Sequence, residues 1–269
     1  MFRLHEKSEI SYRCRHLKPA FAFVITLILW AYFTAGFVLF FSPFYLAAFV
    51  FSRNRERSFQ RLNHRFYKGF FKLLRILMPA TRWRIHEDVL SIRASVIVCN
   101  HISYLDSILM ISLFAQHRTI VKSRFFKIPI FRQVIELSGY IPSTSEGDLS
   151  DLMIRRIEEM DSFFEAGGNL FVFPEGTRSR GGAIGPLNKG AFKIARLSRR
   201  PIKVLFVQNT DKLFQPGRFL FNTGFEGAVS VETLAGIEPD YQGERFSVSG
   251  LMAQVRSLLE TEQSKRKTG

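Results

Sequence analysis

The residues best suited to chemistry in this chain are a histidine and an aspartate five positions apart. His101 and Asp106 lie in the segment N-H-I-S-Y-L-D, which follows the apolar run Val96–Cys99. A carboxylate that contacts one imidazole nitrogen fixes the tautomer, so the other nitrogen can accept a proton as a general base. Positions five apart in one helix point about 140° apart, so the pair can meet only if His101 lies at or before the helix start. The alternative is that Asn100 and His101 merely cap that helix.

A second group of polar residues follows another apolar run, Asn169–Phe173, which we predict to be a strand that stops at Pro174. The segment F-P-E-G-T-R-S combines an acid, a glycine, two hydroxyls and an arginine in one turn. Arginine binds phosphate with two parallel hydrogen bonds, and glycine lets the backbone approach a ligand closely. The nearby positive charges are Arg180, Lys189 and Lys193. A strand-end turn closed by a Glu–Arg ion pair is the alternative.

Together these segments resemble the family of glycerophospholipid acyltransferases, which contains the 1-acyl-glycerol-3-phosphate acyltransferases. The first motif of that family, N-H-x-x-x-x-D, is found here from Asn100 to Asp106. Its third motif, F-P-E-G-T-R-S, is found letter for letter from Phe173 to Ser179. The resemblance covers roughly Val96 to Val207, and it rests on the pair of motifs, since either one alone arises more easily by chance.

The resemblance implies a role for each matching residue. His101 would be the general base that deprotonates the acceptor hydroxyl, with Asp106 as its partner. The hydroxyl would then attack a thioester carbonyl directly, with no covalent enzyme intermediate, no cofactor and no metal. The acceptor phosphate site would contain Glu175, Gly176, Thr177 and Arg178, with Lys122 and Lys189 as further candidates. A solvated surface position is the alternative for both lysines.

Two departures from the family pattern bear on the acceptor. The second motif begins with Gly139–Ile141, but Ser145 stands where an arginine is expected. The fourth motif, usually P-I-V-P-like, is Pro201–Val204, with the sequence P-I-K-V. We therefore expect 1-acyl-glycerol-3-phosphate as the acceptor, with another lysolipid or an amphiphile of a specialised pathway as the alternative.

The elements that position these residues begin with a long apolar segment. From Pro19 to Ser52 the chain has no charged residue, and such a run exceeds the roughly 20 residues of a membrane-spanning helix. We expect one spanning helix from Ala20 to about Phe41 that ends or kinks near Pro43, followed by an interfacial piece. A re-entrant helical hairpin and a buried soluble helix pair are the alternatives. Basic residues flank both ends of the run, so topology stays open.

The next segment, Ser58–Met78, has the period of an amphipathic helix. Its apolar face carries Phe59, Leu62, Phe66, Phe70, Leu73 and Leu77, and its basic face carries Arg61, Arg65, Lys68, Lys72 and Arg75. We expect this helix to lie in the headgroup layer of an anionic membrane. The alternative is a surface helix whose apolar face packs on the domain core.

Beyond Trp83, short strands alternate with helices, which predicts an α/β fold with a mixed sheet flanked by helices. We expect strands at Thr119–Lys122 and Ile202–Val207, and helices at Leu149–Glu165, Asn188–Leu197 and from Ser247 to about Glu262. The expected organisation is a basic N-terminal segment (1–18), a membrane-embedded segment (19–52), an interfacial helix (53–80), an acyltransferase domain (81–263) and a disordered tail (264–269).

Charge and cysteine content limit the possible partners. The net charge of +15 favours an anionic partner, which leaves nucleic acid, anionic lipid, and an acidic acyl carrier protein or coenzyme A. No nucleic-acid-binding motif is evident, and a charge-free run of this length does not suit that role. Cys14 and Cys99, the only cysteines, form neither a disulfide framework nor a metal site.

The expected partners are therefore membrane lipids, a lysophospholipid acceptor, and an acyl carrier protein or acyl-coenzyme A as donor. The expected location is the inner (cytoplasmic) membrane with the catalytic domain on the cytoplasmic face, in phospholipid biosynthesis. The alternatives are a thioesterase that uses the same base on water and a non-catalytic relative on the same membrane-bound fold.

Overall fold

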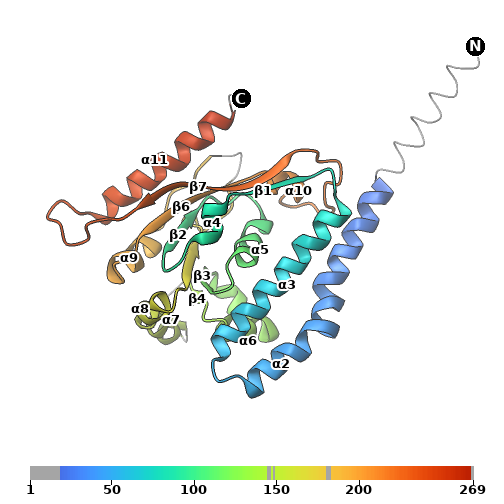
Figure 1. Ribbon diagram of the computed structural model, residues 1–269, viewed down its shortest axis with the longest axis horizontal. Coiled ribbons are helices and arrows are strands. Elements are labelled where there is room, and N and C mark those ends of the chain that lie inside the picture. Colours follow the sequence, from blue (N-terminus) through green and yellow to red (C-terminus); the bar gives the residue numbers. More distant parts are fainter. Residues whose placement is uncertain (1–18, 144–146, 148, 180–182, 268–269) are drawn as a thin grey trace, which may run out of the picture.

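A computed structural model describes residues 19–143, 147, 149–179 and 183–267. Its centre is one seven-stranded sheet (Figure 1). The strands are β1 (Arg82–Ile85), β2 (Val96–Cys99), β3 (His117–Val121), β4 (Ile141–Pro142), β5 (Asn169–Val172), β6 (Ile202–Gln208) and β7 (Ala228–Ile237). The helices in the domain are α4 (Glu87–Ser91), α5 (Tyr104–Leu113), η2 (Ser123–Lys127), α6 (Pro129–Leu137), α7 (Leu149–Glu158), α8 (Met160–Glu165), α9 (Gly190–Leu197), α10 (Thr210–Leu213) and α11 (Val248–Lys267).

The sheet has the strand order β1-β7-β6-β2-β5-β3-β4, and all neighbours are parallel except β6 and β7. This confirms the predicted mixed α/β fold. β2 lies in the middle, and all four of its residues are buried, as expected for an apolar strand covered on both faces. β2 and β5 are parallel neighbours. Their carboxyl ends therefore meet at one edge of the sheet, and this brings the two sequence motifs together.

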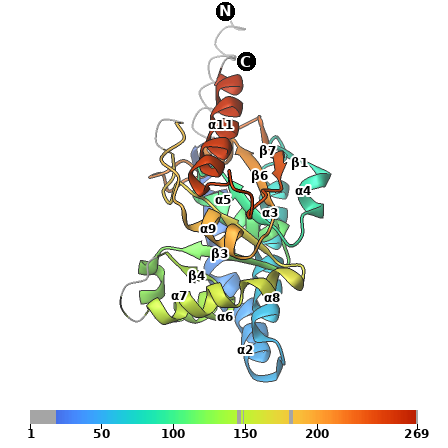
Figure 2. The same cartoon turned by 90° about the vertical axis from the view of Figure 1, so that its left-hand side faces the viewer.

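Helices cover both faces of the sheet in separate layers. One core contains Ile97, Phe171 and Leu205 from the strands and packs under α3 (Arg55–Leu77) and α5. The other contains Val98, Leu170 and Val204 and packs under α8, α9 and α11. Figure 2 views the molecule from the side of this second layer. One face of the sheet is therefore covered by the N-terminal helix α3 together with α5. The other face is covered by α8, α9 and α11.

The apolar segment forms one helix, Pro19–Phe51, long and apolar enough to cross a membrane. Its second half comprises the π-helical η1 (Tyr32–Phe41) and then α2 (Ser42–Phe51). The Ser42 N–H bonds five residues back to Phe37 O, just before Pro43, which lacks an N–H of its own. The helix changes direction before α2 but does not end (Figure 1). Many of its large apolar side chains are exposed, which does not fit a buried soluble pair.

The element that folds back against this helix is α3, so within the described residues there is no hairpin inside the apolar segment. Aromatic rings pair along the contact, including Phe33 with Phe70 and Tyr45 with Phe59. The apolar face of α3 is therefore buried inside the protein, as the alternative interpretation held. The apolar helix and the sheet core cover this face, so a headgroup-layer position of α3 stays a prediction that rests on its basic face. The exposed face of α3 is basic.

Buried polar contacts fix α3 to the rest of the domain. The Asn63 amide donates to Ser138 Oγ at 2.8 Å and to the Tyr140 hydroxyl at 3.2 Å. Arg118, only 3% exposed, donates to both carboxylate oxygens of Glu56, at 2.7 and 2.9 Å. A buried arginine requires such charged partners. These bonds tie α3 to Arg118 of β3 and to the segment between α6 and β4.

Two predicted helix boundaries differ from the structure. The single helix predicted over Leu149–Glu165 is interrupted at Glu159. It therefore forms two helices, α7 and α8. The tail was predicted to be disordered from Ser264, but α11 continues to Lys267. Arg266 accounts for the extension, since it bonds Glu262 of its own helix together with Gln208 and Glu232 of the sheet. The predicted cap is confirmed, because Ser247 Oγ accepts from Gly250 N–H.

Candidate active site

His101 and Asp106 are in direct contact at the carboxyl end of β2. His101 Nδ1 lies 2.9 Å from Asp106 Oδ2, and the Asp106 side chain is fully buried. α5 begins only at Tyr104, so His101 precedes the helix as the spacing required. Because an ionised carboxylate only accepts hydrogen bonds, Nδ1 carries the hydrogen, and Nε2 is left to accept one. The histidine thus has the tautomer of a general base.

The carboxylate of Asp106 is held by four donors. Besides His101, the backbone N–H groups of Ile102 and Ser103 donate to Oδ2, each at 2.7 Å. The Thr210 hydroxyl donates to Oδ1. Ser103 is the N-cap of α5 and forms a capping box with Asp106. The Asp106 carboxylate therefore both caps α5 and orients the His101 ring. Its position does not depend on the bond to His101 alone.

The Asn100 side chain bonds the neighbouring strand β6 and does not cap α5. Its side chain accepts from Val207 N–H at 2.7 Å and donates to Val207 O at 2.9 Å. This pair of bonds imitates the backbone ladder and extends the pairing of β2 with β6 by one position. The His101 loop is thereby anchored at the point where β2 ends, so the alternative of an Asn-His cap is wrong.

The third-motif loop packs directly against His101. The Phe173 ring stacks on the imidazole with centroids 4.4 Å apart, and Ser179 N–H donates to His101 O at 2.7 Å. Glu175 is buried, and its carboxylate accepts from His101 N–H at 3.1 Å and from Ser179 Oγ at 2.7 Å. A third donor is Gly185 N–H, at 2.9 Å. The structure therefore gives Glu175 a positioning task, and its occupied, anionic oxygens do not suit direct contact with phosphate.

Arg178 is the residue of this loop whose side chain can bind an anion. Its guanidinium lies over the Tyr104 ring, with Cζ 3.4 Å from the ring centre. Its Nη1 is buried and has no hydrogen-bond partner among the described residues, so one strong donor remains for a ligand. Gly176 has a φ of +64°, and a Cβ there would meet Asn188 Nδ2 at 2.9 Å, so the turn requires glycine. Thr177 is exposed beside it.

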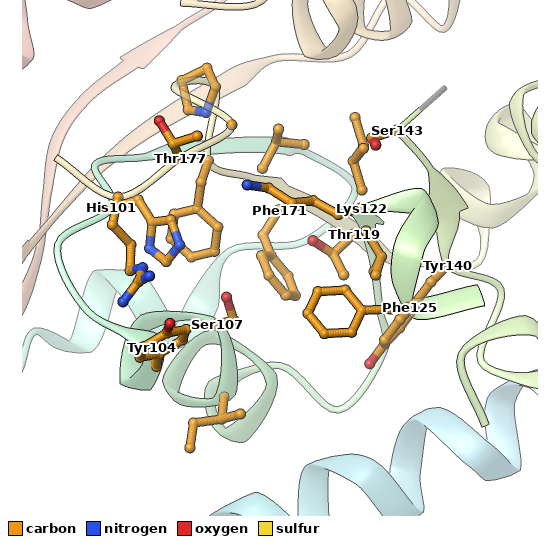
Figure 3. A pocket seen from close by; sticks show the side chains of 18 of the residues that line it. His101, Tyr104, Ser107, Thr119, Lys122, Phe125, Tyr140, Ser143, Phe171 and Thr177 are labelled. Carbon is orange, nitrogen blue, oxygen red and sulfur yellow. The ribbon is translucent and has the colours of Figure 1, made fainter. Parts of the chain in front are cut away.

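One cavity of about 1460 Å³ joins these residues. His101 and Thr177 lie at one end of the view in Figure 3, Tyr140 and Phe125 at the other, and Lys122 between them. The cationic side chains that line it are Lys122, Arg124, Arg178, Lys189 and Lys212, against one carboxylate among the described lining residues, Asp211. The candidates Lys122 and Lys189 thus belong to the site, at its exposed rim. Lys193, exposed on α9, is not among the lining residues.

Away from His101 the cavity becomes apolar. It runs between α5, α6 and β3, and its lining there includes Ile108, Ile111, Phe125, Phe131, Ile135 and Phe171. Asn63 and Tyr67 of α3 also line it. Because this part is mainly apolar and belongs to the same cavity as the polar end, it has the chemistry to hold a hydrocarbon chain whose polar end lies beside His101.

Two residues named from the sequence lie outside the described part of the chain, and some residues of the site were not predicted. Ser145 and Arg180 lie outside the described residues, whereas Tyr140 and Ser143 of the second-motif region line the cavity. Sequence reasoning missed Thr210 and Lys212, which follow β6 and carry no motif of their own. Among the described residues no cluster of three or more His, Cys, Asp or Glu side chains could hold a metal ion.

The sequence of this chain is similar to those of known acyltransferases. Residues 80–207 match the sequence profile of the Acyltransferase family. A chloroplastic 1-acyl-sn-glycerol-3-phosphate acyltransferase of Brassica napus is 33% identical over 123 residues, which cover 45% of this chain and 35% of that protein. The enzyme of that name from Borreliella burgdorferi is 26% identical over 62% of this chain and 66% of its own length. The chain thus spans between about a third and two thirds of these relatives.

The fold also matches a solved structure. The crystal structure of the 1-acyl-sn-glycerophosphate acyltransferase PlsC from Thermotoga maritima superposes with a TM-score of 0.69. The superposition covers 94% of this chain and 98% of that one, at 22% sequence identity. The similarity therefore includes the N-terminal helices as well as the sheet, and it establishes a shared fold.

Proposed function

We propose that this chain, whose residues 80–207 match the Acyltransferase family, is a glycerophospholipid acyltransferase that transfers a fatty acyl group from a thioester to the free hydroxyl of 1-acyl-glycerol-3-phosphate. The observation that carries the proposal is that His101, Arg178 and an apolar channel line one cavity. A general base, a free phosphate donor and a place for an acyl chain are the parts that this transfer needs.

In the proposed mechanism His101 Nε2 takes the proton of the acceptor hydroxyl while Asp106 stabilises the resulting imidazolium. The hydroxyl oxygen attacks the thioester carbonyl, the carbon–sulfur bond breaks, and the proton passes from the imidazolium to the departing thiolate. The new bond is an ester, and no acyl-enzyme forms. Arg178 and Thr177 bind the acceptor phosphate, and Glu175 keeps their loop against His101.

The rim lysines favour an anionic donor carrier as well as an anionic acceptor. Lys122, Lys189 and Lys212 surround the mouth of the cavity, where phosphates of coenzyme A or acidic side chains of an acyl carrier protein would approach. Both donors contain the same phosphopantetheine thioester, so the reaction at His101 is the same for either one. No cofactor takes part in the proposed chemistry.

We propose that the apolar helix Pro19–Phe51 contacts the membrane. Its pairing with α3 bears on whether it crosses the bilayer. α3 runs alongside it and carries exposed basic residues over the same length, namely Arg61, Arg65, Lys68 and Lys72. In a helix that crossed the bilayer these charges would reach hydrocarbon depth, at a cost of about 3 kcal/mol or more each. We therefore propose that the helix lies in one leaflet, with the catalytic domain on the cytoplasmic face of the inner membrane.

The test offers membranes that contain the protein a panel of acceptors and donors. The acceptors are 1-acyl-glycerol-3-phosphate, other lysophospholipids and monoacylglycerol, and each is supplied with acyl carrier protein and coenzyme A thioesters of several chain lengths. Mass analysis should detect diacylglycerol-phosphate that depends on the acceptor. Free fatty acid without that product would favour a thioesterase, and no turnover of any pair would favour a non-catalytic relative.

A further inference from the structure

The loop after α10 carries an exposed aromatic surface beside the mouth of the cavity. Phe219 is 55% exposed and Leu220 37% exposed, and Arg218 next to them is also exposed. On the neighbouring elements, Trp30 is 37% and Tyr104 51% exposed. We call Trp30, Tyr104, Phe219 and Leu220 the aromatic rim. Large exposed apolar side chains that gather in one place mark an interaction surface.

The loop is fixed to the apolar helix and does not merely lie near it. Phe219 stacks flat on Trp30, with centroids 5.9 Å apart and planes within 7°. Phe221 N–H donates to Thr26 Oγ1 at 3.0 Å, a buried bond between positions 195 residues apart. Phe221 itself is buried against Phe214 and Phe70. The exposed tip therefore keeps a constant position relative to the apolar helix.

The same loop is fixed to the catalytic residues at its other end. Ser103 Oγ donates to Phe214 O at 3.1 Å, and Pro216 lines the cavity. Tyr104, a member of the rim, carries the Arg178 guanidinium on its ring. The aromatic rim thus connects the apolar helix to the phosphate-binding end of the cavity.

We propose that the aromatic rim is a second membrane-docking surface, seated at the headgroup layer of the same leaflet as the apolar helix. The proposal deepens the proposed function, on whose membrane seating it rests. Three features identify the partner as a bilayer. The rim is continuous with an apolar helix, it combines Trp and Tyr with Phe as membrane-interface belts do, and Arg218 can pair with lipid phosphates. Docking here places Arg178 at phosphate depth, so that the acceptor enters sideways from the leaflet past Tyr104.

A fluorescence experiment tests docking without relying on activity. In the full-length Cys14→Ser protein the remaining cysteine, Cys99, is buried, so an added surface cysteine can be labelled selectively. A polarity-sensitive dye is placed at Phe219→Cys, at Leu39→Cys on the apolar helix and at Leu197→Cys, an exposed position on α9. The proteins are reconstituted into vesicles of phosphatidylethanolamine and phosphatidylglycerol with or without nitroxide-labelled lipid.

The proposal predicts blue-shifted, nitroxide-quenched emission at positions 219 and 39 and water-like emission at 197. Water-like emission at 219 together with a shift at 39 would overturn the docking surface and leave the helix seating intact. Water-like emission at both would overturn docking and seating together. These readouts do not require turnover, so a failure of the transferase proposal appears separately, in the acceptor panel.

Activity supplies a second readout with a matched control. The double substitution F219S/L220S should lower the ratio of vesicle-borne to detergent-dispersed acceptor turnover by about tenfold, because two apolar side chains no longer enter the interface. Leu197→Ser and Ile154→Ser, which remove equally exposed apolar side chains elsewhere, should leave the ratio unchanged. An unchanged ratio in F219S/L220S would contradict the proposal.

Discussion

Thr210 donates its hydroxyl hydrogen to Oδ1 of Asp106, the carboxylate oxygen that does not contact His101, although 104 residues separate the two. Both side chains are fully buried. The carboxylate is thus fixed from the β6 side of the sheet as well as from its own helix. Because Thr210 does not touch the cavity, it acts on the reaction only through Asp106, as a positioning residue.

Thr210→Val should therefore lower kcat about tenfold and leave both KM values unchanged, since a hydrogen bond to a charged group contributes about 1.5–3 kcal/mol. Thr210→Ser keeps the hydroxyl and should restore most of the rate. Steady-state kinetics on the purified variants measures this difference. A valine variant that folds normally and keeps its kcat would show that the other three donors suffice to hold Asp106.

Arg178→Ala should raise the KM for a phosphate-bearing acceptor about tenfold or more and change the donor KM little, because it removes a charged donor whose Nη1 has no other hydrogen-bond partner in the described part of the chain. With monoacylglycerol, which lacks the phosphate, the same substitution should have little effect. Arg245→Ala, an exposed arginine outside the cavity lining, serves as the control. Equal changes for both acceptors would indicate that Arg178 supports the loop rather than the phosphate.

His117 makes the stability of the fold depend on pH. Burial lowers the pKa of His117 to about 3, and its ring lies between Phe114 O and the Tyr140 hydroxyl, each at 2.7 Å. Between pH 6.5 and about 3 the unfolded chain binds a proton at this position and the folded chain does not. Stability is therefore full above pH 6.5 and falls as pH decreases, by about 2–3 kcal/mol between pH 6.5 and 4.5.

Unfolding free energies of the detergent-solubilised protein across this range measure the slope. His117→Gln should be less stable at neutral pH, because the packing of the ring is lost, and should show a flatter pH dependence. Burial also lowers the pKa of His64, which adds a slope of the same sign in both proteins. An unchanged slope in His117→Gln would mean that other groups cause the acid sensitivity.

Local sequence predicted much of the fold and the centre of the site. The apolar run of β2, the break at Pro174 and the two motifs predicted that His101 and Arg178 follow strand ends, because each strand end is decided by residues close in the chain. Glu175 was assigned to the phosphate because a motif does not reveal the direction of a side chain, and its partners, including His101 N–H, are up to 74 residues away. Thr210 was missed for the same reason.

The two N-terminal elements show a different limit. The helical period of α3 and the apolar character of Pro19–Phe51 were evident, but each apolar face has two possible partners, lipid or protein. Only the tertiary structure shows that Phe66 packs against Tyr32 and Phe33, so that the apolar face of α3 is used within the protein. β7 was also not predicted, and its antiparallel pairing with β6 includes a register shift between Val204 and Leu205 that local patterns do not indicate.

We propose that His101 is the base in a direct acyl transfer, and the turnover of purified His101→Ala in vesicles tests this role. We expect a loss of about 10²–10⁴-fold in transfer to 1-acyl-glycerol-3-phosphate, with membrane association unchanged. His86→Ala, which removes an exposed histidine outside the cavity lining, should retain full activity. Transfer by His101→Ala at a rate near that of the unaltered protein would contradict the account.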